Sequence, residues 1–310
     1  MKPSNICPSL FDDFFENEAI DRIRRFEALA KKMGFVPVCQ FSGGKDSQVC
    51  YDLCRRAGIE FRVVFNHCFE SAVTLNFIRT QYPEVEWRRE VKQGFFQNIK
   101  QNHGGLLPTV ELAYCCEDYK HNRRYVDAAS IVGVRKAESI KRAQRKVLET
   151  KNKTVLKKNA ATIGDYFSAG CVASGASSEI QLKPIVDWSE TDVWNYIRRH
   201  NLPINPEYKF CRRVGCVVCP KANISNNYRA LMAQPKLIDA VIKARNGYGD
   251  WIINSENKDY ADNKAEYVCR WLNHSFRPFT KKQRELADKV IENYNTIAKI
   301  FQKDSPPQLP

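Results

Sequence analysis

Short apolar runs alternate along the first half of the chain with segments whose apolar residues recur every three or four positions. The first such segment, 11–33, predicts an amphipathic helix that Gly34 ends. Strands are expected over 36–40, 60–65, 85–91 and 128–134, with helices over 48–57 and 74–81 between the first three. The alternation predicts an α/β fold with a doubly wound, mostly parallel sheet.

Helical spacing dominates the later part of the 310-residue chain. Ser189 is a typical N-cap, and the acidic Asp192 three residues later is typical of a capping box. Further helices are expected over 228–233, 235–244 and 281–301. A helical C-terminal region therefore follows the predicted sheet.

Two segments carry no clear periodicity. Residues 93–112 contain glycines and a proline and are expected to form a loop. Residues 141–180 begin with a run of lysines and arginines and end in a stretch rich in glycine, alanine and serine, which predicts a mobile, basic excursion. A solvated loop without a specific role is the alternative for this excursion.

The turn between the first strand and its helix has the composition of a phosphate-binding loop. Its residues are, in order, Ser42, Gly43, Gly44, Lys45, Asp46 and Ser47. Glycines let the backbone turn sharply, and the following helix presents unpaired N–H groups and a partial positive charge. The lysine and the two serine hydroxyls can donate to phosphate oxygens. The sequence thus predicts an anion site at this turn.

The spacing within this loop differs from the Walker motif, which places four residues between its glycines. The loop is identified instead as a PP-loop, because it resembles the Ser-Gly-Gly-x-Asp-Ser motif of ATP pyrophosphatases residue for residue. The resemblance implies that the chain binds ATP and cleaves it to AMP and pyrophosphate while activating a substrate by adenylation. An ordinary Gly-Gly turn is the alternative.

The charge of the chain favours a polyanionic partner. Lysine and arginine number 49 against 35 acidic residues, a net charge of +14. This balance favours nucleic acid as a partner, and solvated surface charge is the alternative. The basic and aromatic segment 269–282 suits either a nucleic acid or the protein core. No apolar run reaches the length of a membrane span and the N-terminus lacks a signal-peptide core, so a cytoplasmic protein without membrane association is expected.

One group among the twelve cysteines has the spacing of metal ligands. Cys216-x-x-Cys219 places two thiols on a tight turn, and the adjacent Cys115 and Cys116 are the obvious source of two more. Adjacent cysteines can bind two irons of one cluster more easily than they serve a single zinc ion. In a cytosolic chain of this length the cysteines do not indicate a disulfide framework.

Several separate motifs between residues 36 and 220 resemble the phosphoadenylylsulfate (PAPS) reductase-like superfamily. They are Gly133-x-Arg135-x-x-Glu138-Ser139, the segments 184–188 and 192–197, Glu70 with Thr74, and the two cysteine pairs. The superfamily includes assimilatory sulfonucleotide reductases, which hold a [4Fe–4S] cluster. The resemblance therefore implies this cluster, with the ligands Cys115, Cys116, Cys216 and Cys219. The alternative is a structural Zn²⁺ held by Cys211, Cys216, Cys219 and either Cys116 or Cys269.

Two departures separate the chain from those reductases. Their first loop is modified to bind a sulfonucleotide, whereas this chain keeps the complete PP-loop. They also carry a C-terminal Glu-Cys-Gly-x-His segment, and Cys269 lies in a different sequence. In addition, Asn66 stands where the superfamily usually has aspartate. In this combination the chain is closest in character to the sulfur-transfer proteins of DNA phosphorothioation, of the Dnd type.

The resemblance implies that Lys45, Asp46 and Arg135 are catalytic and that Gly133 lies at the nucleotide. The PP-loop would hold the pyrophosphate end of ATP, with Asp46 placing Mg²⁺ and Arg135 pairing with phosphate or a substrate anion. A structural ion pair with Glu138 is the alternative role of Arg135. Asn66 and His67 would lie near the adenosine, although a histidine after a strand is more often a packed or capping residue.

The expected function is an ATP pyrophosphatase that activates its substrate for sulfur transfer on DNA or tRNA. A sulfur-donor protein, such as a cysteine desulfurase, is an expected partner. Two alternatives are a sulfonucleotide (PAPS or APS) reductase and a nucleotide- or nucleic-acid-binding subunit of a phage or defence complex without independent catalysis. The absent C-terminal cysteine segment argues against the reductase.

The expected domain organisation follows from these patterns. Residues 1–35 form an N-terminal helix packed on the core, and 36–200 form a PP-loop nucleotide-binding domain that includes the 141–180 excursion. Residues 201–303 form a cysteine-rich segment and a helical region, and 304–310 form a disordered tail.

Overall fold

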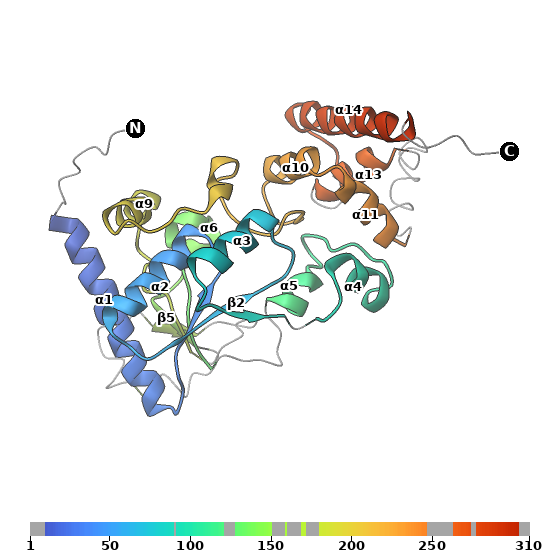
Figure 1. Cartoon of the computed structure of the whole chain (residues 1–310). Helices are drawn as coiled ribbons and strands as arrows, with labels where there is room; N and C mark the ends of the chain where they lie inside the picture. The colour runs from blue at the N-terminus through green and yellow to red at the C-terminus, as the bar shows by residue number, and fades with distance from the viewer. Residues whose placement is uncertain are drawn as a thin grey trace. The chain divides into compact units, whose positions relative to one another are not determined.

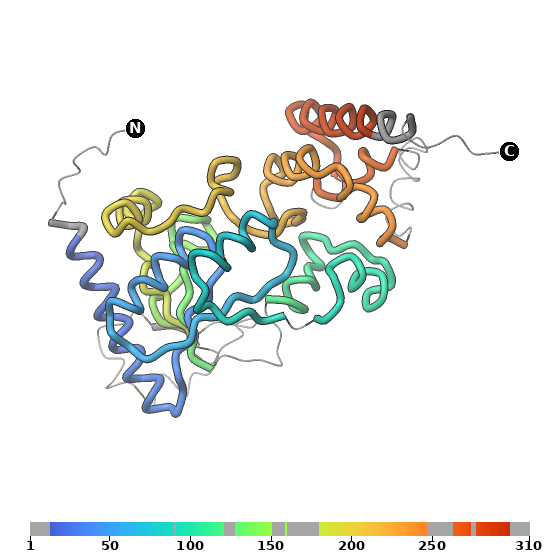
Figure 2. Tube along the Cα trace, in the orientation of Figure 1, coloured from blue at the N-terminus to red at the C-terminus, as the bar shows by residue number. Residues whose placement is uncertain are grey.

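The chain forms two compact units, each built from discontinuous segments. A computed structural model describes residues 10–89, 91–120, 128–150, 159, 169–171, 180–246, 263–273 and 277–303 (Figure 1). Figure 2 follows the same chain as a Cα trace. The first unit comprises 1–67, 72–89 and 119–214, and the second comprises 68–71, 90–118 and 215–310. The predicted tail over 304–310 lies outside the described residues.

The described residues of the first unit are organised around a seven-stranded sheet. Its strands in the described part of the chain are β1 (Val38–Phe41), β2 (Arg62–Asn66), β3 (Glu86–Arg88), β4 (Ala129–Ile131), β5 (Leu148–Thr150), β6 (Ala169–Cys171) and β7 (Ile180–Leu182). They lie in the order β3-β2-β1-β4-β7-β5-β6. All neighbouring pairs are parallel except β5 and β7. The predicted doubly wound, mostly parallel sheet is confirmed.

The strand order reverses at β1, which places the PP-loop at a switch point. From β1 the chain moves outward to β2 and β3, and then returns to β4 on the other side of β1. Phe41 pairs with Phe65 and Cys39 pairs with Ile131, so β1, β2 and β4 end at the same edge of the sheet. Ligands of open α/β sheets bind at such an edge, where the strand order reverses.

Three helices pack together beside this sheet: α1 (Leu10–Lys32), α2 (Lys45–Ala57) and α9 (Glu190–Arg199) (Figure 1). Their apolar residues share one buried core with those of the strands. The predicted capping box of α9 is confirmed, because Asp192 N donates to Ser189 Oγ and Ser189 N donates to Asp192 Oδ2. Helix α3 (Ala72–Gln81) connects β2 to β3.

The prediction of a loop over 93–112 is wrong for α4 (Phe95–Asn102). Phe95 stacks on Phe69, with ring centroids 4.9 Å apart. The buried Asn98 donates to Asp118 Oδ2 at 2.8 Å. These partners lie elsewhere in the chain, and the helical spacing of Phe95 and Ile99 in this eight-residue helix is too short a pattern to predict it with the neighbouring glycines and proline.

The prediction of a mobile excursion over 141–180 is wrong where the structure describes it. Helix α6 (Ile140–Ala143) and the strands β5 and β6 fall within or at the start of this range. Glu149 of β5 is buried, and its Oε2 lies 2.9 Å from Nζ of the buried Lys183. This ion pair connects β5, in the lysine-rich segment, to the residue that follows β7. The larger part of the excursion lies outside the described residues.

The second unit is mainly helical. Besides α4 its helices, within the described ranges, are α5 (Tyr114–Tyr119, of which the last residue falls in the first unit), α10 (Ile224–Ala233), α11 (Lys236–Ala244), α13 (Lys264–Leu272) and α14 (Lys281–Lys303). Eight residues of α13, from Ala265 to Leu272, are buried. Trp271 Nε1 donates to Pro108 O at 2.7 Å, so this part of 269–282 belongs to the core.

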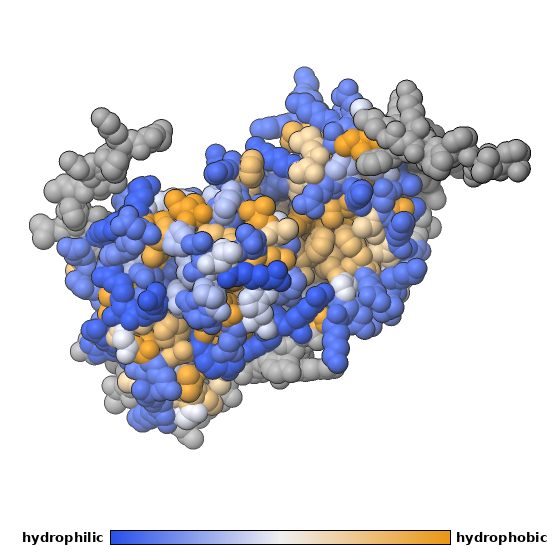
Figure 3. Space-filling view, viewed as in Figure 1, coloured by the Kyte–Doolittle hydropathy of each residue, from blue (hydrophilic) through white to orange (hydrophobic). Residues whose placement is uncertain are grey.

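Hydrophilic residues predominate on the face of the molecule in Figure 3, with apolar residues in separate areas between them. Among the side chains that the structure describes, the most exposed large apolar ones are Ile140, Phe210 and Phe14. None of the helices within the described residues combines the length and the apolar character that crossing a bilayer requires.

Candidate functional site

The PP-loop follows β1 and leads directly into α2, as the sequence predicts. Gly43 has φ +70°, the left-handed conformation that favours glycine, and a Cβ there would lie 3.0 Å from Ile78 Cγ1. Ser47 Oγ donates to Gly44 O at 2.8 Å and accepts from Ser42 N at 3.1 Å. The hydroxyl of Ser47 therefore closes the loop on itself, in addition to the phosphate contacts predicted for it.

Two side-chain amides donate hydrogen bonds to the Gly43 carbonyl. Gln48 Nε2 donates to it at 3.2 Å, and Asn205 Nδ2 donates at 3.0 Å. Asn205 is fully buried and also donates to Thr74 Oγ1 at 3.2 Å. The sequence analysis missed Asn205, although the Asn-Pro dipeptide at 205–206 marks a turn. That turn is η3 (Pro206–Lys209), whose N-cap is Asn205.

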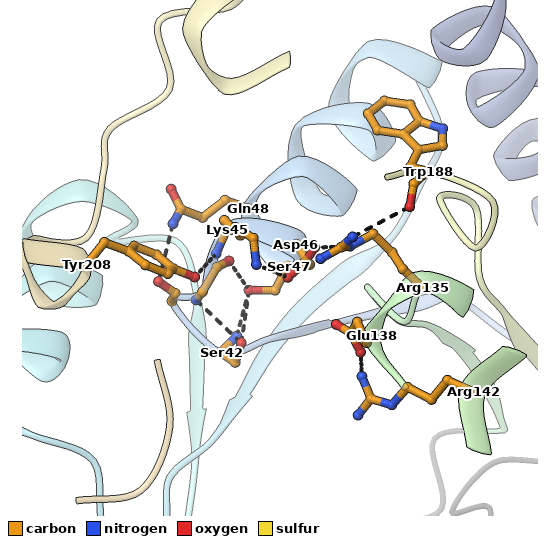
Figure 4. A network of polar contacts seen from close by, with 12 residues as sticks. Ser42, Lys45, Asp46, Ser47, Gln48, Arg135, Glu138, Arg142, Trp188 and Tyr208 are labelled. Atoms are coloured by element: carbon orange, nitrogen blue, oxygen red, sulfur yellow. Dashed lines mark hydrogen bonds and ion pairs between the residues drawn. The ribbon is translucent and has the colours of Figure 1, made fainter. Parts of the chain in front are cut away.

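The carboxylate of Asp46 lies between two buried cations (Figure 4). Arg135 Nε donates to Asp46 Oδ1 at 2.5 Å, and Lys45 Nζ lies 3.1 Å from Asp46 Oδ2. The structure thus brings together the three residues that the sequence analysis singled out as catalytic. Glu138, the alternative partner of Arg135, forms an ion pair with Arg142 instead.

Gly133 allows the segment after β4 to approach the start of α2. A Cβ at this position would lie 2.7 Å from both the carbonyl carbon and the carbonyl oxygen of Asp46. These are backbone atoms, so a larger residue would require one of the two segments to move. The missing side chain of Gly133 therefore sets how closely Arg135 can approach Asp46.

Further arginines surround this ion-pair group. Burial lowers the pKa of Arg142, and the positive charges of Arg213, Arg145 and Arg135 lower it further. The negative charge of Asp46 acts in the opposite direction. Arg142 pairs with Glu138 and Arg145 with Glu149. The carboxylate of Asp46, by contrast, faces both Lys45 and Arg135, and this excess of positive charge favours the binding of an anion.

The hydroxyl of Tyr208 lies against the PP-loop. Tyr208 is in η3, and its Oη accepts a hydrogen bond from the backbone N–H of Lys45 at 2.7 Å (Figure 4). Its ring lies edge to face with Trp194, 5.1 Å between centroids. The sequence analysis missed this residue, because 163 positions separate it from Lys45 and no short motif connects them.

The two residues expected near adenosine follow β2. Asn66 Nδ2 donates to Gln40 Oε1 at 2.9 Å, so this amide bridges β2 to β1. His67 N donates to Arg88 O at 2.9 Å, and its ring lies 5.9 Å from the rings of Phe65 and Trp87. His67 is thus packed among aromatic residues at the carboxyl edge of the sheet.

The four cysteines predicted as cluster ligands all belong to the second unit. The pKa of Cys115 is raised by its hydrogen bond with Cys116, then by burial, and further by the nearby thiols of Cys116, Cys216 and Cys219. These causes place all four thiols in one neighbourhood. Cys211, which the zinc alternative requires, belongs to the first unit and lies near Tyr208.

A buried carboxylate also lies beside this cysteine group. Glu70 Oε2 accepts from Cys68 N at 2.9 Å, and its Oε1 lies 3.9 Å from Cys216 Sγ. Glu70 and Cys216 also form an isolated antiparallel bridge. Among the described residues, no three His, Cys, Asp or Glu side chains stand in the arrangement that would hold a single metal ion. The four thiols share one neighbourhood, and thiolates are the ligand type of iron–sulfur and zinc sites.

Residues 36–222, more than half of the chain, match the family described as the phosphoadenosine phosphosulfate reductase domain. This range contains the PP-loop, Arg135, Tyr208 and the four cysteines.

The chain is similar to several proteins at low identity. One uncharacterized protein of Methanocaldococcus jannaschii is 23% identical over 76% of this chain and 53% of its own length. A second is 28% identical over 73% of this chain and 44% of its own length. The chain thus spans about half the length of these two relatives. Sulfate adenylyltransferase subunit 2 of Parabacteroides distasonis is 27% identical over 65% of this chain and 68% of its own length. A crystal structure of PAPS reductase from Candida auris in complex with phosphate has a TM-score of 0.44 at 14% identity, covering 69% of this chain and 98% of that one.

Proposed function

This chain belongs to the phosphoadenosine phosphosulfate reductase domain family, and on that premise we propose that it binds ATP at the PP-loop, cleaves it between the α- and β-phosphates and transfers AMP to an acceptor. The observation that carries the proposal is the convergence of Lys45, Asp46 and Arg135 on one loop at the switch point of the sheet. The intact Ser-Gly-Gly-Lys-Asp-Ser sequence resembles the loop of ATP pyrophosphatases, which release pyrophosphate, and this resemblance supports the proposal.

Each loop residue has a role in the proposed reaction. An acceptor oxygen attacks the α-phosphorus, the bond from that phosphorus to the bridging oxygen breaks, and pyrophosphate leaves with the bond electrons. The amides at the start of α2 and the ammonium of Lys45 receive the charge that develops on the leaving group. Arg135 pairs with a phosphate oxygen or with the acceptor. Catalysis of this kind is mainly positioning and charge stabilisation.

Mg²⁺ fits this site as an ion that arrives with the nucleotide. Both carboxylate oxygens of Asp46 already have cationic partners, Arg135 on one and Lys45 on the other. Mg²⁺ is commonly held by one or two carboxylates together with substrate phosphates. ATP phosphates can take over these two cations, which frees Asp46 to hold the metal. Bound Mg²⁺ would neutralise charge on the leaving pyrophosphate.

We place sulfur transfer to nucleic acid first among the acceptor reactions. The net charge of +14 favours a polyanionic acceptor such as DNA or tRNA. A sulfur nucleophile delivered by a donor protein would then displace AMP from the adenylated position. The resemblance to phosphorothioation proteins supports this order of steps. Asn66 and His67, which follow β2, are proposed to lie near the adenosine.

Sulfate is the second candidate acceptor. The observation that favours it is the name of the relative from Parabacteroides distasonis, a sulfate adenylyltransferase subunit. The arginines around Arg142 suit a small oxyanion beside the PP-loop. The product would be adenylyl sulfate, formed with release of pyrophosphate. A partner subunit is then expected for this chain as well.

An ATP-cleavage assay tests the proposal. The protein is incubated with Mg²⁺ and ATP labelled in the α-phosphate, in separate reactions with DNA, with tRNA, with sulfate and without acceptor. Release of AMP and pyrophosphate that depends on one acceptor supports the proposal and identifies the acceptor class. Release of ADP, or no cleavage with any acceptor, contradicts it. Thiol-dependent release of sulfite from adenylyl sulfate would favour a reductase instead.

We further propose that Cys115, Cys116, Cys216 and Cys219 hold a [4Fe–4S] cluster. Such a cluster would supply a place to hold or relay sulfur, or a structural crosslink within the second unit. Protein purified without oxygen is expected to be brown and to contain about four irons per chain. Cys216→Ser is expected to lose most of this iron.

Cys211→Ser is the matched control for the cluster, since Cys211 belongs to the first unit, and it is expected to keep its iron. A colourless protein that carries zinc would contradict the cluster and favour the zinc alternative. Loss of metal in Cys211→Ser would make Cys211 a ligand.

A further inference from the structure

Two hydrogen bonds connect η3 and its N-cap to the PP-loop. Asn205 Nδ2 donates to Gly43 O at 3.0 Å, and Tyr208 Oη accepts from Lys45 N at 2.7 Å. Asn205 Oδ1 also accepts from Glu207 N at 3.0 Å, which holds the turn of η3 itself. The position of the Tyr208 hydroxyl is therefore set by a fully buried anchor three residues earlier.

The backbone N–H of Lys45, which donates to Tyr208, is one of the groups that a phosphate site at this loop requires. Lys45 is the first residue of α2, so its N–H has no acceptor within the helix. Such groups, together with the partial positive charge of the helix end, form the anion site of a strand-loop-helix unit. One N–H hydrogen makes one good hydrogen bond. A phosphate oxygen and the Tyr208 oxygen therefore compete for it.

We propose that Tyr208 is a built-in competitor of the phosphate site: its hydroxyl accepts the hydrogen bond of the Lys45 amide and must be displaced before a phosphate oxygen binds there. This inference rests on the proposed function, because it assumes that the PP-loop binds the phosphates of ATP. Tyr208 thereby regulates the occupancy of that same site.

A neutral phenol accepts a weaker hydrogen bond than an anionic phosphate, so a phosphate can displace it. Burial raises the pKa of Tyr208 above its usual value, so the hydroxyl stays neutral near pH 7. Hydrogen bonds to a charged acceptor are roughly twice as strong as those between neutral groups. An anionic phosphate oxygen therefore replaces the phenol, whereas water gains little by doing so. The Lys45 ammonium, 5.9 Å from the centre of the Tyr208 ring, lies beside the same position.

The competitor lowers the apparent affinity of the site. A ligand that must first displace an internal group binds only to the fraction of molecules in which the group has left. Removal of the hydroxyl should therefore strengthen phosphate binding. If the hydroxyl instead donated to the bound phosphate, its removal would weaken binding.

The test compares Tyr208→Phe with the unaltered protein by titration with inorganic pyrophosphate and with ATP. Pyrophosphate is expected to bind Tyr208→Phe roughly threefold to tenfold more tightly, the value of one hydrogen bond that no longer has to be broken. Tyr51→Phe is the matched control, because the Tyr51 hydroxyl donates to Glu84 and not to the loop. The affinity of Tyr51→Phe is expected to equal that of the unaltered protein.

The outcomes separate this inference from the proposed function. Equal or weaker binding by Tyr208→Phe, with binding by the unaltered protein, overturns the inference alone. Failure of both proteins to bind pyrophosphate and ATP overturns both. Binding by Tyr208→Phe alone supports the inference strongly.

A second measurement uses the unaltered protein, in case Tyr208→Phe does not fold. With ¹⁵N-labelled lysine, the Lys45 amide resonance is assigned by its loss in Lys45→Arg. The resonance is expected to shift when pyrophosphate is added, because the acceptor changes from a phenol to an anion. A resonance that stays in place at saturating pyrophosphate overturns the inference.

Discussion

Lys45→Ala is expected to lower the rate of AMP release from ATP by roughly 100-fold to 1,000-fold, the loss typical for removal of one group that stabilises developing charge. Lys45 is 5% exposed and its ammonium lies 3.1 Å from Asp46. In this low-dielectric position its charge acts on the leaving pyrophosphate with little screening by water. The rate is measured in a single turnover with saturating ATP and the acceptor that the cleavage assay identifies.

The fold should survive this substitution, because Asp46 keeps its 2.5 Å bond to Arg135. Lys31→Ala is the matched control: Lys31 is also paired with a carboxylate, Glu27 at 2.9 Å, but its side chain is 56% exposed on α1. Its AMP release is expected to match that of the unaltered protein. If Lys45→Ala released AMP as fast as Lys31→Ala does, the role of Lys45 in the reaction would be wrong.

Gly133→Ala is expected to slow AMP release by about 100-fold, because misplacement of a reacting group by about 1 Å costs that much. The new Cβ would lie 2.7 Å from two backbone atoms of Asp46, and neither can rotate away. The segment after β4 must then move away from α2. Arg135 moves with it, since only one residue separates it from Gly133. The expected signature is a low rate together with a weakened Arg135–Asp46 pair.

Gly94→Ala provides the control for this substitution. A Cβ at Gly94 meets nothing within 4 Å, and the backbone there has no positive φ. Its thermal unfolding midpoint and AMP release are expected to stay close to those of the unaltered protein. Gly133→Ala should lower both. Unchanged AMP release in Gly133→Ala would show that the close approach of the two segments is not required.

The local elements of the first unit were accessible to sequence analysis. The strand, the PP-loop and α2 follow one another without interruption, so their signals all lie within residues 38–57. The capping box of α9 depends on Ser189 and Asp192 alone. By contrast, α4 and β5 are stabilised by partners far along the chain: Asp118 for Asn98, and Lys183 for Glu149. A strand of three residues is too short to show a period, and in the eight-residue α4 only Phe95, Phe96 and Ile99 are apolar.

In the candidate site, too, the sequence identified residues in local motifs but not the partners that lie far along the chain. Motif comparison identified Lys45, Asp46 and Arg135, but it left the partner of Arg135 open between phosphate and Glu138. The structure pairs Arg135 with Asp46, 89 positions away, and pairs Glu138 with Arg142. The thiol pairs at 115–116 and 216–219 were likewise predicted to meet. Their common neighbourhood in the second unit depends on how that unit packs.

Neighbouring residues encode a strand, a glycine turn and a helix, so the PP-loop at the end of a parallel strand could be predicted from the sequence alone. The surroundings of that loop depend on the tertiary structure. Asn205 and Tyr208 reach it across 162 and 163 positions, and Gly133 approaches it from another strand. Such contacts arise from the order of strands in the sheet and the packing of η3. A short motif records neither, because it describes only residues that are adjacent along the chain.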